Sequence, residues 1–335
     1  KRNDEGVWIT GAKAHQTGCL NSHWLVVMPT MRLGEGDEDY AIVSAIPVEA
    51  EGITYIYGRQ SCDTRAMEGG DIDTGNNEYG GQEAMVIFDD VFIPWDRVFM
   101  HGEYEYAAML VERFTCYHRR SYVCKSGVGD VLIGAAATVA EYNGADKASH
   151  IKDKLTEMTH LNETIYSTGI AASYQSQKLK SGAWICDDMI ANVCKHHVTK
   201  MPYEIGRLAQ DLAGGLVVTL PSQKDFESPE IGGLLEKYLK GRADVPTENR
   251  MRILRLIENM TMGRNAVGYL TESMHGAGSP QAQRIQIARA AQMDFRKALA
   301  KELAGIEETD REEMLDTFTD YFARVFTAAE PKEKA

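Results

Sequence analysis

The stretch Val111–Asp130, VERFTCYHRRSYVCKSGVGD, is dense in side chains that could do chemistry. In a helix, His118 and Tyr122 lie four residues apart and share a face, whereas Cys124 lies nearly two turns beyond the histidine. Imidazole and thiolate are ligands that soft and borderline metals prefer. Two ligands do not complete a metal site, and a lone histidine and cysteine in a helix are more often packed or solvated. A metal site and a structural segment are therefore both open interpretations.

The segment Tyr269–Pro280, YLTESMHGAGSP, combines a carboxylate with an imidazole. Glu272 and His275 are about one helical turn apart, in a stretch whose glycines interrupt regular structure after a predicted long helix. A carboxylate and an imidazole in irregular backbone are better candidates for acid–base catalysis than either residue alone. The functional and the structural interpretation have equal weight here.

Two predicted β segments carry groups that suit a cofactor or a proton transfer. Gly11–Gly18, GAKAHQTG, offers backbone N–H groups, a hydroxyl and a cation where we expect two strands to be joined. Its Lys13, Gln16 and Thr17 could hold the polar edge of a flavin or a phosphate, although a simple turn explains the segment equally well. Glu83 begins a predicted apolar strand and could move protons if buried. An exposed residue at a strand end is the commoner arrangement.

Composition excludes several classes of protein. The 335 residues carry a net charge of −13, which argues against a nucleic-acid partner. The longest apolar stretches, Val131–Ala140 and Leu212–Leu220, are shorter than the roughly 20 residues that cross a bilayer, so we expect no membrane partner. Six scattered cysteines favour a reducing, cytoplasmic location. The chain starts without methionine inside a predicted sheet, so we expect a piece of a longer protein.

Periodicity divides the chain into a β part, residues 1–103, and a helical part, residues 104–335. Segregated strands and helices define an α+β fold with a bundle of antiparallel helices. We expect Gly127 and Gly129 to break the first helix of the bundle. We also expect His196 and His197, next to Lys195, to lie on a solvated helix face, which could alternatively meet an anionic ligand. The other helices are predicted at Val131–Tyr142, Ser149–Ile170, Trp184–Ala213, Glu248–Tyr269, Pro280–Leu303 and Glu308–Phe326.

Six motifs point to a family. They are YHRRSYVCKSGVGD, GAKAHQTG, NSHW, KDKLTEMTHLNET, PYEI and TESMHGAGSPQAQR. In these motifs, and over nearly its whole length, the chain resembles the 4-hydroxybutyryl-CoA dehydratases, a branch of the 4-hydroxyphenylacetate 3-hydroxylase family. The resemblance implies an acyl-CoA dehydrogenase-like fold, in which a β-barrel-type middle domain precedes a C-terminal antiparallel helical bundle. It also implies that this chain lacks the N-terminal helical domain of the family.

The resemblance implies a homotetrameric lyase and isomerase that carries FAD and a [4Fe–4S] cluster. Such an enzyme removes water from 4-hydroxybutyryl-CoA to give crotonyl-CoA, and it isomerises vinylacetyl-CoA. His118 and Cys124 match two cluster ligands, and two more cysteines would come from an N-terminal domain or polypeptide. The spacing between this histidine and cysteine is one residue shorter than in the family pattern. Since one residue turns a helical side chain by about 100°, we expect a non-helical turn between them.

The resemblance also implies roles in the reaction. The residues that match active-site groups of the family are Thr17, near the flavin, the carboxylates Glu83 and Glu272, and Tyr122 and Lys125 beside the ligands. Glu272 would take the α-proton and His118 would assist removal of the β-proton, which a transient one-electron oxidation by the flavin makes acidic. Lys125 and Tyr122 would stabilise the enolate or the leaving hydroxyl.

Two other interpretations stay open. A flavin-dependent aromatic monooxygenase of the same wider family would need flavin but no iron, and His118 and Cys124 would then be structural. A non-catalytic subunit that assembles with a complete partner would need neither cofactor. Substrate trials separate the first of these from a dehydratase, and isolation of the chain without partners tests the second.

Overall fold

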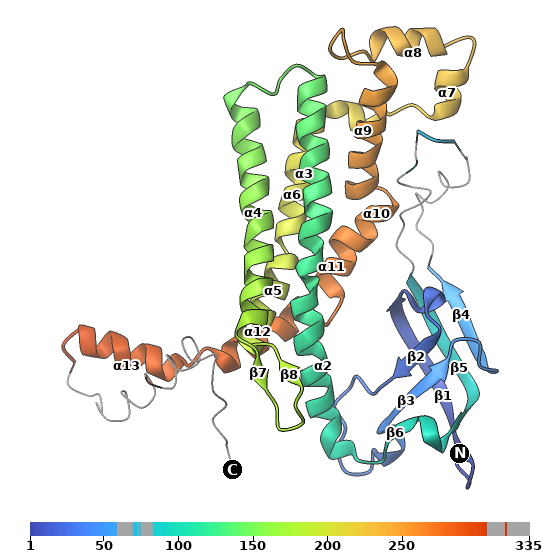
Figure 1. Cartoon of the computed structure of the whole chain (residues 1–335), viewed down its shortest axis with the longest axis vertical. Coiled ribbons are helices and arrows are strands. Elements are labelled where there is room, and N and C mark those ends of the chain that lie inside the picture. The colour runs from blue at the N-terminus through green and yellow to red at the C-terminus, as the bar shows by residue number, and fades with distance from the viewer. Residues whose placement is uncertain (59–69, 73, 75–82, 307–318, 320–335) are drawn as a thin grey trace. The chain divides into compact units, whose positions relative to one another are not determined.

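The computed structural model describes residues 1–58, 70–72, 74, 83–306 and 319 (Figure 1). It divides into two compact units, the first made of Lys1–Phe114 with Glu258–Gly268 and the second of Thr115–Ile257 with Tyr269–Ala335. Strands dominate the first unit and helices the second, which confirms the α+β class. The boundary between residues 103 and 104 stays a prediction. Apart from Thr319, the predicted helix Glu308–Phe326 lies outside the described residues.

In the described part of the first unit, six strands form two antiparallel sheets of three strands each. The strand orders are β1-β5-β4 and β2-β3-β6 (Figure 1). The strands are β1 Gly6–Thr17, β2 Trp24–Val27, β3 Ile42–Pro47, β4 Ile53–Tyr57, β5 Glu83–Pro94 and β6 Val98–His101. Central strand β5 pairs with both β1 and β4, and this pairing places its first residue, Glu83, opposite Thr17 of β1.

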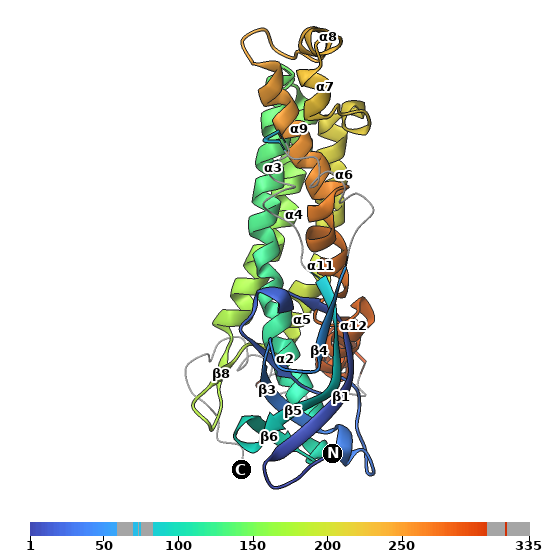
Figure 2. The ribbon, with the colours of Figure 1, turned by 90° about the vertical axis from the view of Figure 1, so that its right-hand side faces the viewer.

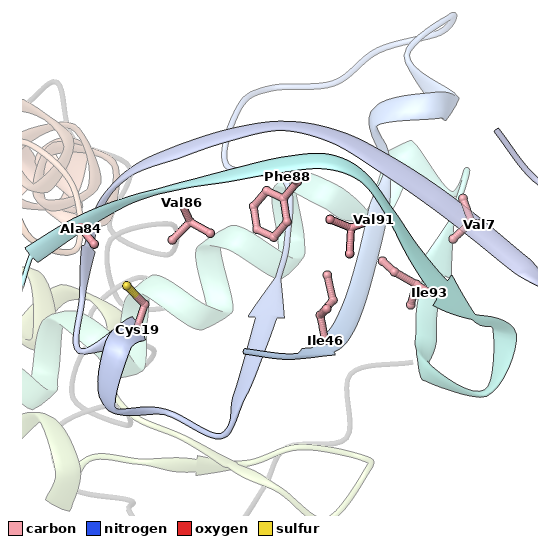
Figure 3. Packing of buried hydrophobic residues seen from close by; sticks show 8 residues of the cluster. All are labelled: Val7, Cys19, Ile46, Ala84, Val86, Phe88, Val91 and Ile93. Atoms are coloured by element: carbon pink, nitrogen blue, oxygen red, sulfur yellow. The ribbon is translucent and has the colours of Figure 1, made fainter. Parts of the chain in front are cut away.

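Alternate residues of β5 form much of the core of this unit. Phe88 and Val91 both point toward Ile46 of β3 (Figure 3), although their odd spacing breaks the alternation of a regular strand. A bulge explains the change, because Asp90 has a φ of 54° and the pairing with β1 shifts register there. The complete cluster is Val7, Cys19, Ile46, Ala84, Val86, Phe88, Val91 and Ile93.

The segment Gly11–Gly18, expected to join two strands, instead belongs to β1 as far as Thr17. Its glycines and polar residues are typical of a turn, but Thr17 still pairs with Glu83 on β5. A register shift and a φ of 62° at His15 interrupt the ladder. The irregularity that suggested a turn is therefore a bulge within a long strand.

The second unit is a helical bundle. Helices α3 Lys125–Tyr142, α4 Ser149–Tyr174 and α6 Met201–Ala213 pack against one another (Figure 2), and a short connection makes α3 and α4 antiparallel. A hairpin of β7 Gln177–Lys178 and β8 Trp184–Ile185 follows α4. The other helices of the described chain are α2 Ala107–Ser121, α5 Asp188–Val198, α7 Gln223–Glu227, α8 Gly232–Tyr238, α9 Thr247–Thr261, α10 Arg264–Ala266, α11 Glu272–His275, α12 Pro280–Ala290 and α13 Met293–Leu303.

Gly127 and Gly129 do not break a helix, contrary to the prediction. Helix α3 begins at Lys125 and continues through both glycines, and the interruption comes earlier, as a 3-10 turn at Tyr122–Cys124. This turn lies where the shortened histidine–cysteine spacing predicts a departure from the α-helix. Packing explains Gly129, because a Cβ there would lie 2.1 Å from Oδ1 of Asn162 on α4. The glycine lets the two helices approach closely.

Three other predicted helices are divided in the structure. Within Glu248–Tyr269, α9 ends at Thr261, and the short helix α10 and a π-helical turn, Val267–Thr271, follow it. Within Trp184–Ala213, strand β8 precedes α5, and α5 begins where the Asp187 carboxylate accepts a 2.8 Å hydrogen bond from the Ile190 N–H. Within Pro280–Leu303, a φ of 45° at Gln292 separates α12 from α13. Apolar spacing alone does not show these breaks, because the periodicity continues on both sides of each one.

Among the described residues, the continuous helical stretch Tyr104–Tyr142 is long and apolar enough to cross a bilayer by length and composition alone. This is weak support for a membrane span, because the core helix of a globular protein meets the same criterion. In the second unit, the α3 portion packs against α4 and α6, as a core helix does. The absence of a membrane partner stays a prediction.

Candidate active site

Two irregular turns bring the candidate residues of the second unit together. The 3-10 turn Tyr122–Cys124 links α2 to α3, and a π-helical turn, Val267–Thr271, leads directly into α11. Turns of π-helix are rare in proteins as a whole, and those that occur are often found at functional sites. The side chains of the first turn and of the start of α3 meet the side chain of Glu272, the first residue of α11.

Glu272 accepts a hydrogen bond at each carboxylate oxygen. The Tyr122 hydroxyl donates to Oε1 over 2.9 Å, and Nζ of Lys125 donates to Oε2 over 2.5 Å. The Lys125 and Glu272 side chains are only 12% and 19% exposed, so water screens this ion pair less than a surface pair. The structure thus brings together three residues that the sequence singled out. His275, the other half of the predicted acid–base pair, is exposed at the end of α11.

Tyr122 occupies a tightly packed position. Its side chain is buried with Ile165 and Val198. A Cβ on Gly276 would lie 1.6 Å from the Tyr122 hydroxyl oxygen. Any residue other than glycine at position 276 would therefore displace the hydroxyl from its bond with Glu272. The glycine that was interpreted as an interruption of structure is needed for this close approach.

Lys195 is part of the site, although the sequence suggested a solvated helix face for the two histidines that follow it. The residue is fully buried, and its Nζ donates to the backbone carbonyls of Ser273 and, over 3.3 Å, Met274. Burial lowers the pKa of Lys195 from 10.5 to about 7, while the charge of Glu272 acts in the opposite direction. A signal was present in the sequence, because position 195 lies on the apolar face of α5.

Arg119 and Gln283 hold the connection that follows α11. Arg119 is buried, and its guanidinium donates to the carbonyl of Ala277 over 3.0 Å and to Oδ1 of Asn192 over 2.8 Å. The buried amide of Gln283 donates to the carbonyl of Gly278 over 2.9 Å. Ala277 and Gly278 have φ values of 56° and 97°. These bonds fix an irregular backbone that spacing rules do not predict.

His118 and Cys124 do not form a complete metal site. The His118 ring lies 5.4 Å from the Tyr122 ring, centroid to centroid, and burial lowers the pKa of His118, opposed by Glu272. A neutral imidazole can ligate a metal or accept a proton. Cys124 is exposed. In the part of the chain that the structure describes, no group of three or more His, Cys, Asp or Glu side chains is arranged to hold a metal ion.

The remaining candidate residues lie in the first unit. Thr17 donates from its hydroxyl to Oε2 of Glu83 over 2.8 Å, which joins two of the candidates. Nζ of Lys13 donates to the carbonyl of Met28 over 2.8 Å, and the amide of Gln16 donates to a carbonyl of its own strand over 2.6 Å. Thr17 is exposed and Gln16 is partly exposed. Both are therefore accessible polar groups beside the bulge of β1.

Comparisons with known proteins identify the family. The family model for the N terminal of 4-hydroxyphenylacetate 3-hydroxylase matches residues 1–100, and the model for its C terminal matches residues 107–305. The chain belongs to the 4-hydroxyphenylacetate 3-hydroxylase family, which confirms the family resemblance seen in the sequence.

Within the family, the chain is similar to dehydratases. It is 56% identical to the 4-hydroxybutyryl-CoA dehydratase/vinylacetyl-CoA-Δ-isomerase of Clostridium aminobutyricum, over 92% of this chain and 65% of that protein. It matches the structure of an oxygen-tolerant archaeal 4-hydroxybutyryl-CoA dehydratase from N. maritimus with a TM-score of 0.92 and 67% identity, over 100% of this chain and 66% of that one. The chain thus spans just under two thirds of each relative.

Two more distant structures show the fold alone. The oxygenase component (HpaB) of 4-hydroxyphenylacetate 3-monooxygenase, complexed with FAD, matches at a TM-score of 0.78 and 24% identity, over 92% of this chain and 65% of that one. Butyryl-CoA dehydrogenase from Megasphaera elsdenii matches at a TM-score of 0.52 and 14% identity, over 87% of this chain and 62% of that one. These matches agree with an acyl-CoA dehydrogenase-like fold.

Proposed function

We propose that the protein dehydrates 4-hydroxybutyryl-CoA to crotonyl-CoA and isomerises vinylacetyl-CoA, the activities in the name of the C. aminobutyricum relative. The observation that carries the proposal is the Glu272 carboxylate, held between the Tyr122 hydroxyl and the Lys125 ammonium. All three residues lie in motifs through which the chain resembles the dehydratases. A carboxylate with two releasable donors suits proton removal next to a thioester.

In the proposed reaction, Glu272 removes the proton from C2 of the acyl-CoA thioester. Once a carboxylate oxygen has taken this proton, Glu272 loses its charge and releases the donors Tyr122 and Lys125. These donors then stabilise negative charge on the thioester oxygen or on the leaving hydroxyl. His118, with its lowered pKa, has a neutral imidazole near pH 7 and accepts the second proton, from C3. One of the two protons leaves with the hydroxide as water, and the other is returned to C4, so that the products are crotonyl-CoA and water.

FAD and a [4Fe–4S] cluster belong to the proposal. Thr17 and Gln16 present a hydroxyl and an amide beside the bulge of β1, and Lys13 adds a cation there, which suits the polar edge of a flavin. Flavin, when bound, would take one electron, which makes the C3 hydrogen acidic, and would return it before the product is complete, so that the overall reaction is redox-neutral. His118 and Cys124 fit two cluster ligands by donor type. The other two would come from outside the described residues.

Assembly and location are part of the same proposal. We expect a homotetramer in the cytoplasm that takes an acyl-CoA substrate, and an N-terminal domain or polypeptide that supplies two cysteines. The longer C. aminobutyricum relative leaves room for such a region. We also expect the two sheets of the first unit to be arranged as a β-barrel-type domain, which the core shared by β3 and β5 supports.

The test is anaerobic dehydration of 4-hydroxybutyryl-CoA by the complete protein, followed as formation of crotonyl-CoA. Glu272→Gln should lower kcat at least about 100-fold, because it removes the base. Tyr122→Phe and Lys125→Met should each lower kcat about 100- to 1,000-fold, because each removes a donor to developing charge. Lys154→Met is the matched control. Nζ of Lys154 lies 2.7 Å from Oδ2 of Asp211, and this ion pair is away from Glu272, Tyr122 and Lys125.

Each contrary result has a separate meaning. Full activity in Glu272→Gln would reject Glu272 as the base. Hydroxylation of 4-hydroxyphenylacetate by the protein with reduced flavin and oxygen, in place of dehydration, would favour the monooxygenase. Failure of both reactions would favour the non-catalytic subunit.

A further inference from the structure

Lys195 on α5 is a buried cation that has no place in the proton transfers above. Its Nζ donates to the carbonyls of Ser273 and Met274, which belong to the single turn of α11. The last carbonyls of a helix have no partners within that helix, and a cation near them also interacts favourably with the helix dipole. Lys195 therefore ties α11, the turn that begins with Glu272, to α5.

The same ammonium group lies over the ring of Tyr122. Nζ of Lys195 is 4.3 Å from the ring centroid, well within the range of about 6 Å for cation–π attraction. Nζ of Lys125 is farther from that centroid, at 5.7 Å. Lys195 thus contacts the residue that donates the hydrogen bond to Glu272 and also the backbone turn that carries this acceptor.

Folding alone gives little reason for a lysine at this position. The other buried residues of α5 are Ala191, Asn192, Cys194 and Val198, and only Asn192 among them is polar. An ammonium group is costly to bury even when it is hydrogen-bonded, whereas a methionine of similar length would fill the same space. Because Lys195 has no exposed surface, it has no direct access to a substrate.

We propose that Lys195 is a positioning residue for Glu272, and that it acts through the carbonyls of α11 and the ring of Tyr122. This role rests on the proposed function, because it takes Glu272 as the base. The bonds from Lys195 hold both the carboxylate and its phenol donor in place. A displacement of about 1 Å in such a pair can cost about a hundredfold in rate.

The first experiment is a double-mutant cycle on kcat for dehydration of 4-hydroxybutyryl-CoA by the complete protein. Lys195→Met should lower kcat about 10- to 100-fold and change KM less than about threefold. It should cause no further loss in a Glu272→Gln background, because both changes disable the same group. Lys154→Met should leave kcat unchanged. A wild-type kcat in Lys195→Met, or losses that multiply in the double variant, would overturn the role.

The second experiment requires no turnover and measures hydrogen–deuterium exchange in residues 272–278 of the same protein. Lys195→Met should speed exchange of the Gly276 amide, which donates to the Glu272 carbonyl over 2.8 Å, at least about tenfold. Lys154→Met should not change it. If Lys195→Met does not fold, Lys195→Gln replaces it in both experiments, because glutamine keeps N–H donors without the charge. We then expect a smaller loss of kcat and a smaller increase in the exchange rate.

The two experiments separate failure of the positioning role from failure of the proposed function. Absence of dehydration in the wild-type protein, with faster exchange in Lys195→Met, would reject the proposed function and support the link between Lys195 and α11. Unchanged exchange in residues 272–278 would reject the positioning role whatever the activity.

Discussion

The charge around Glu272 is opposite in sign to the charge of the whole chain. The chain has a net charge of −13, but Lys195 interacts electrostatically with Lys125 and Arg119 as well as with Glu272. One carboxylate is thus grouped with three basic side chains in a largely buried place, and because the pKa of Lys195 is about 7, Lys195 adds its full charge only below that pH. Such a local field favours negative charge that develops on a substrate oxygen. The overall acidity of the chain therefore does not argue against a reaction that passes through an anionic thioester.

The lowered pKa of Lys195 predicts a pH dependence of stability. Below about pH 7 both the folded and the unfolded protein hold the proton, and above 10.5 neither does. Between these values only the unfolded chain binds it, so this group makes the free energy of unfolding rise with pH. Lys195→Met removes the titration. The free energy of unfolding of the Lys195→Met variant, minus that of the wild type, should therefore fall as the pH rises from 7 to 10. The fall should be at most about 1.4 kcal/mol per pH unit.

Urea unfolding of the two proteins at several pH values measures this difference. Burial raises the pKa of Cys194 from 9.0 to about 11, which affects stability in the opposite sense at high pH, and this pKa also responds to the charge of Lys195. The comparison is therefore clearest between pH 7 and pH 9, where the Cys194 thiol is mostly protonated in both states. A difference between wild type and Lys195→Met that does not change with pH would mean that Lys195 keeps an ordinary pKa in the folded protein.

Helix α4 sets the position of the elements that carry the site. A Cβ on Gly169 of α4 would lie 2.6 Å from Cβ of Val123, the residue after Tyr122 in the 3-10 turn. Nearly two turns farther along the chain, Gly129 of α3 lies against Asn162 of α4 in the same way. Small residues on both sides of this contact let the backbones approach. The hydroxyl of Tyr122 is thus placed partly by a helix that carries no candidate residue.

The two glycines at the start of α3 should respond to alanine in opposite ways. Gly129→Ala should lower the free energy of unfolding by about 1–3 kcal/mol, because Asn162 is buried and its amide is held by Ser126 and Asp130. Gly127→Ala is the matched control. A Cβ there meets nothing within 4 Å, so the gain in helix propensity should raise stability by about 0.5–1 kcal/mol.

Chemical denaturation of the two variants under identical conditions gives both values. Equal effects of the two substitutions would show that the contact between α3 and α4 is looser than the distance to Asn162 indicates. A loss of stability in Gly127→Ala would show that this glycine does not have an ordinary helical environment.

At the scale of the whole molecule, the order of strands and helices was predictable and the site was only partly so. The change from β-rich runs to helical periodicity is visible along the chain, because each pattern is local. The bond between Tyr122 and Glu272 joins residues 150 positions apart, which no spacing rule connects, and only the family resemblance placed them together. The position of Lys195 on the apolar face of α5 indicated burial, but its partners could not be predicted, because they are backbone carbonyls 78 and 79 residues away.

Cofactor content is the property of the whole molecule that the proposal predicts most directly. Anaerobically purified complete protein should contain about four iron atoms and about one FAD per chain. His118→Ala and Cys124→Ala should lose iron and keep FAD, because the proposed flavin groups, including Thr17, lie on β1. Cys194→Ala should keep both, because the Cys194 thiol is fully buried and lies against the carbonyl of Ile165. Iron and flavin analysis of these proteins decides the matter, because full iron in Cys124→Ala would exclude Cys124 as a cluster ligand.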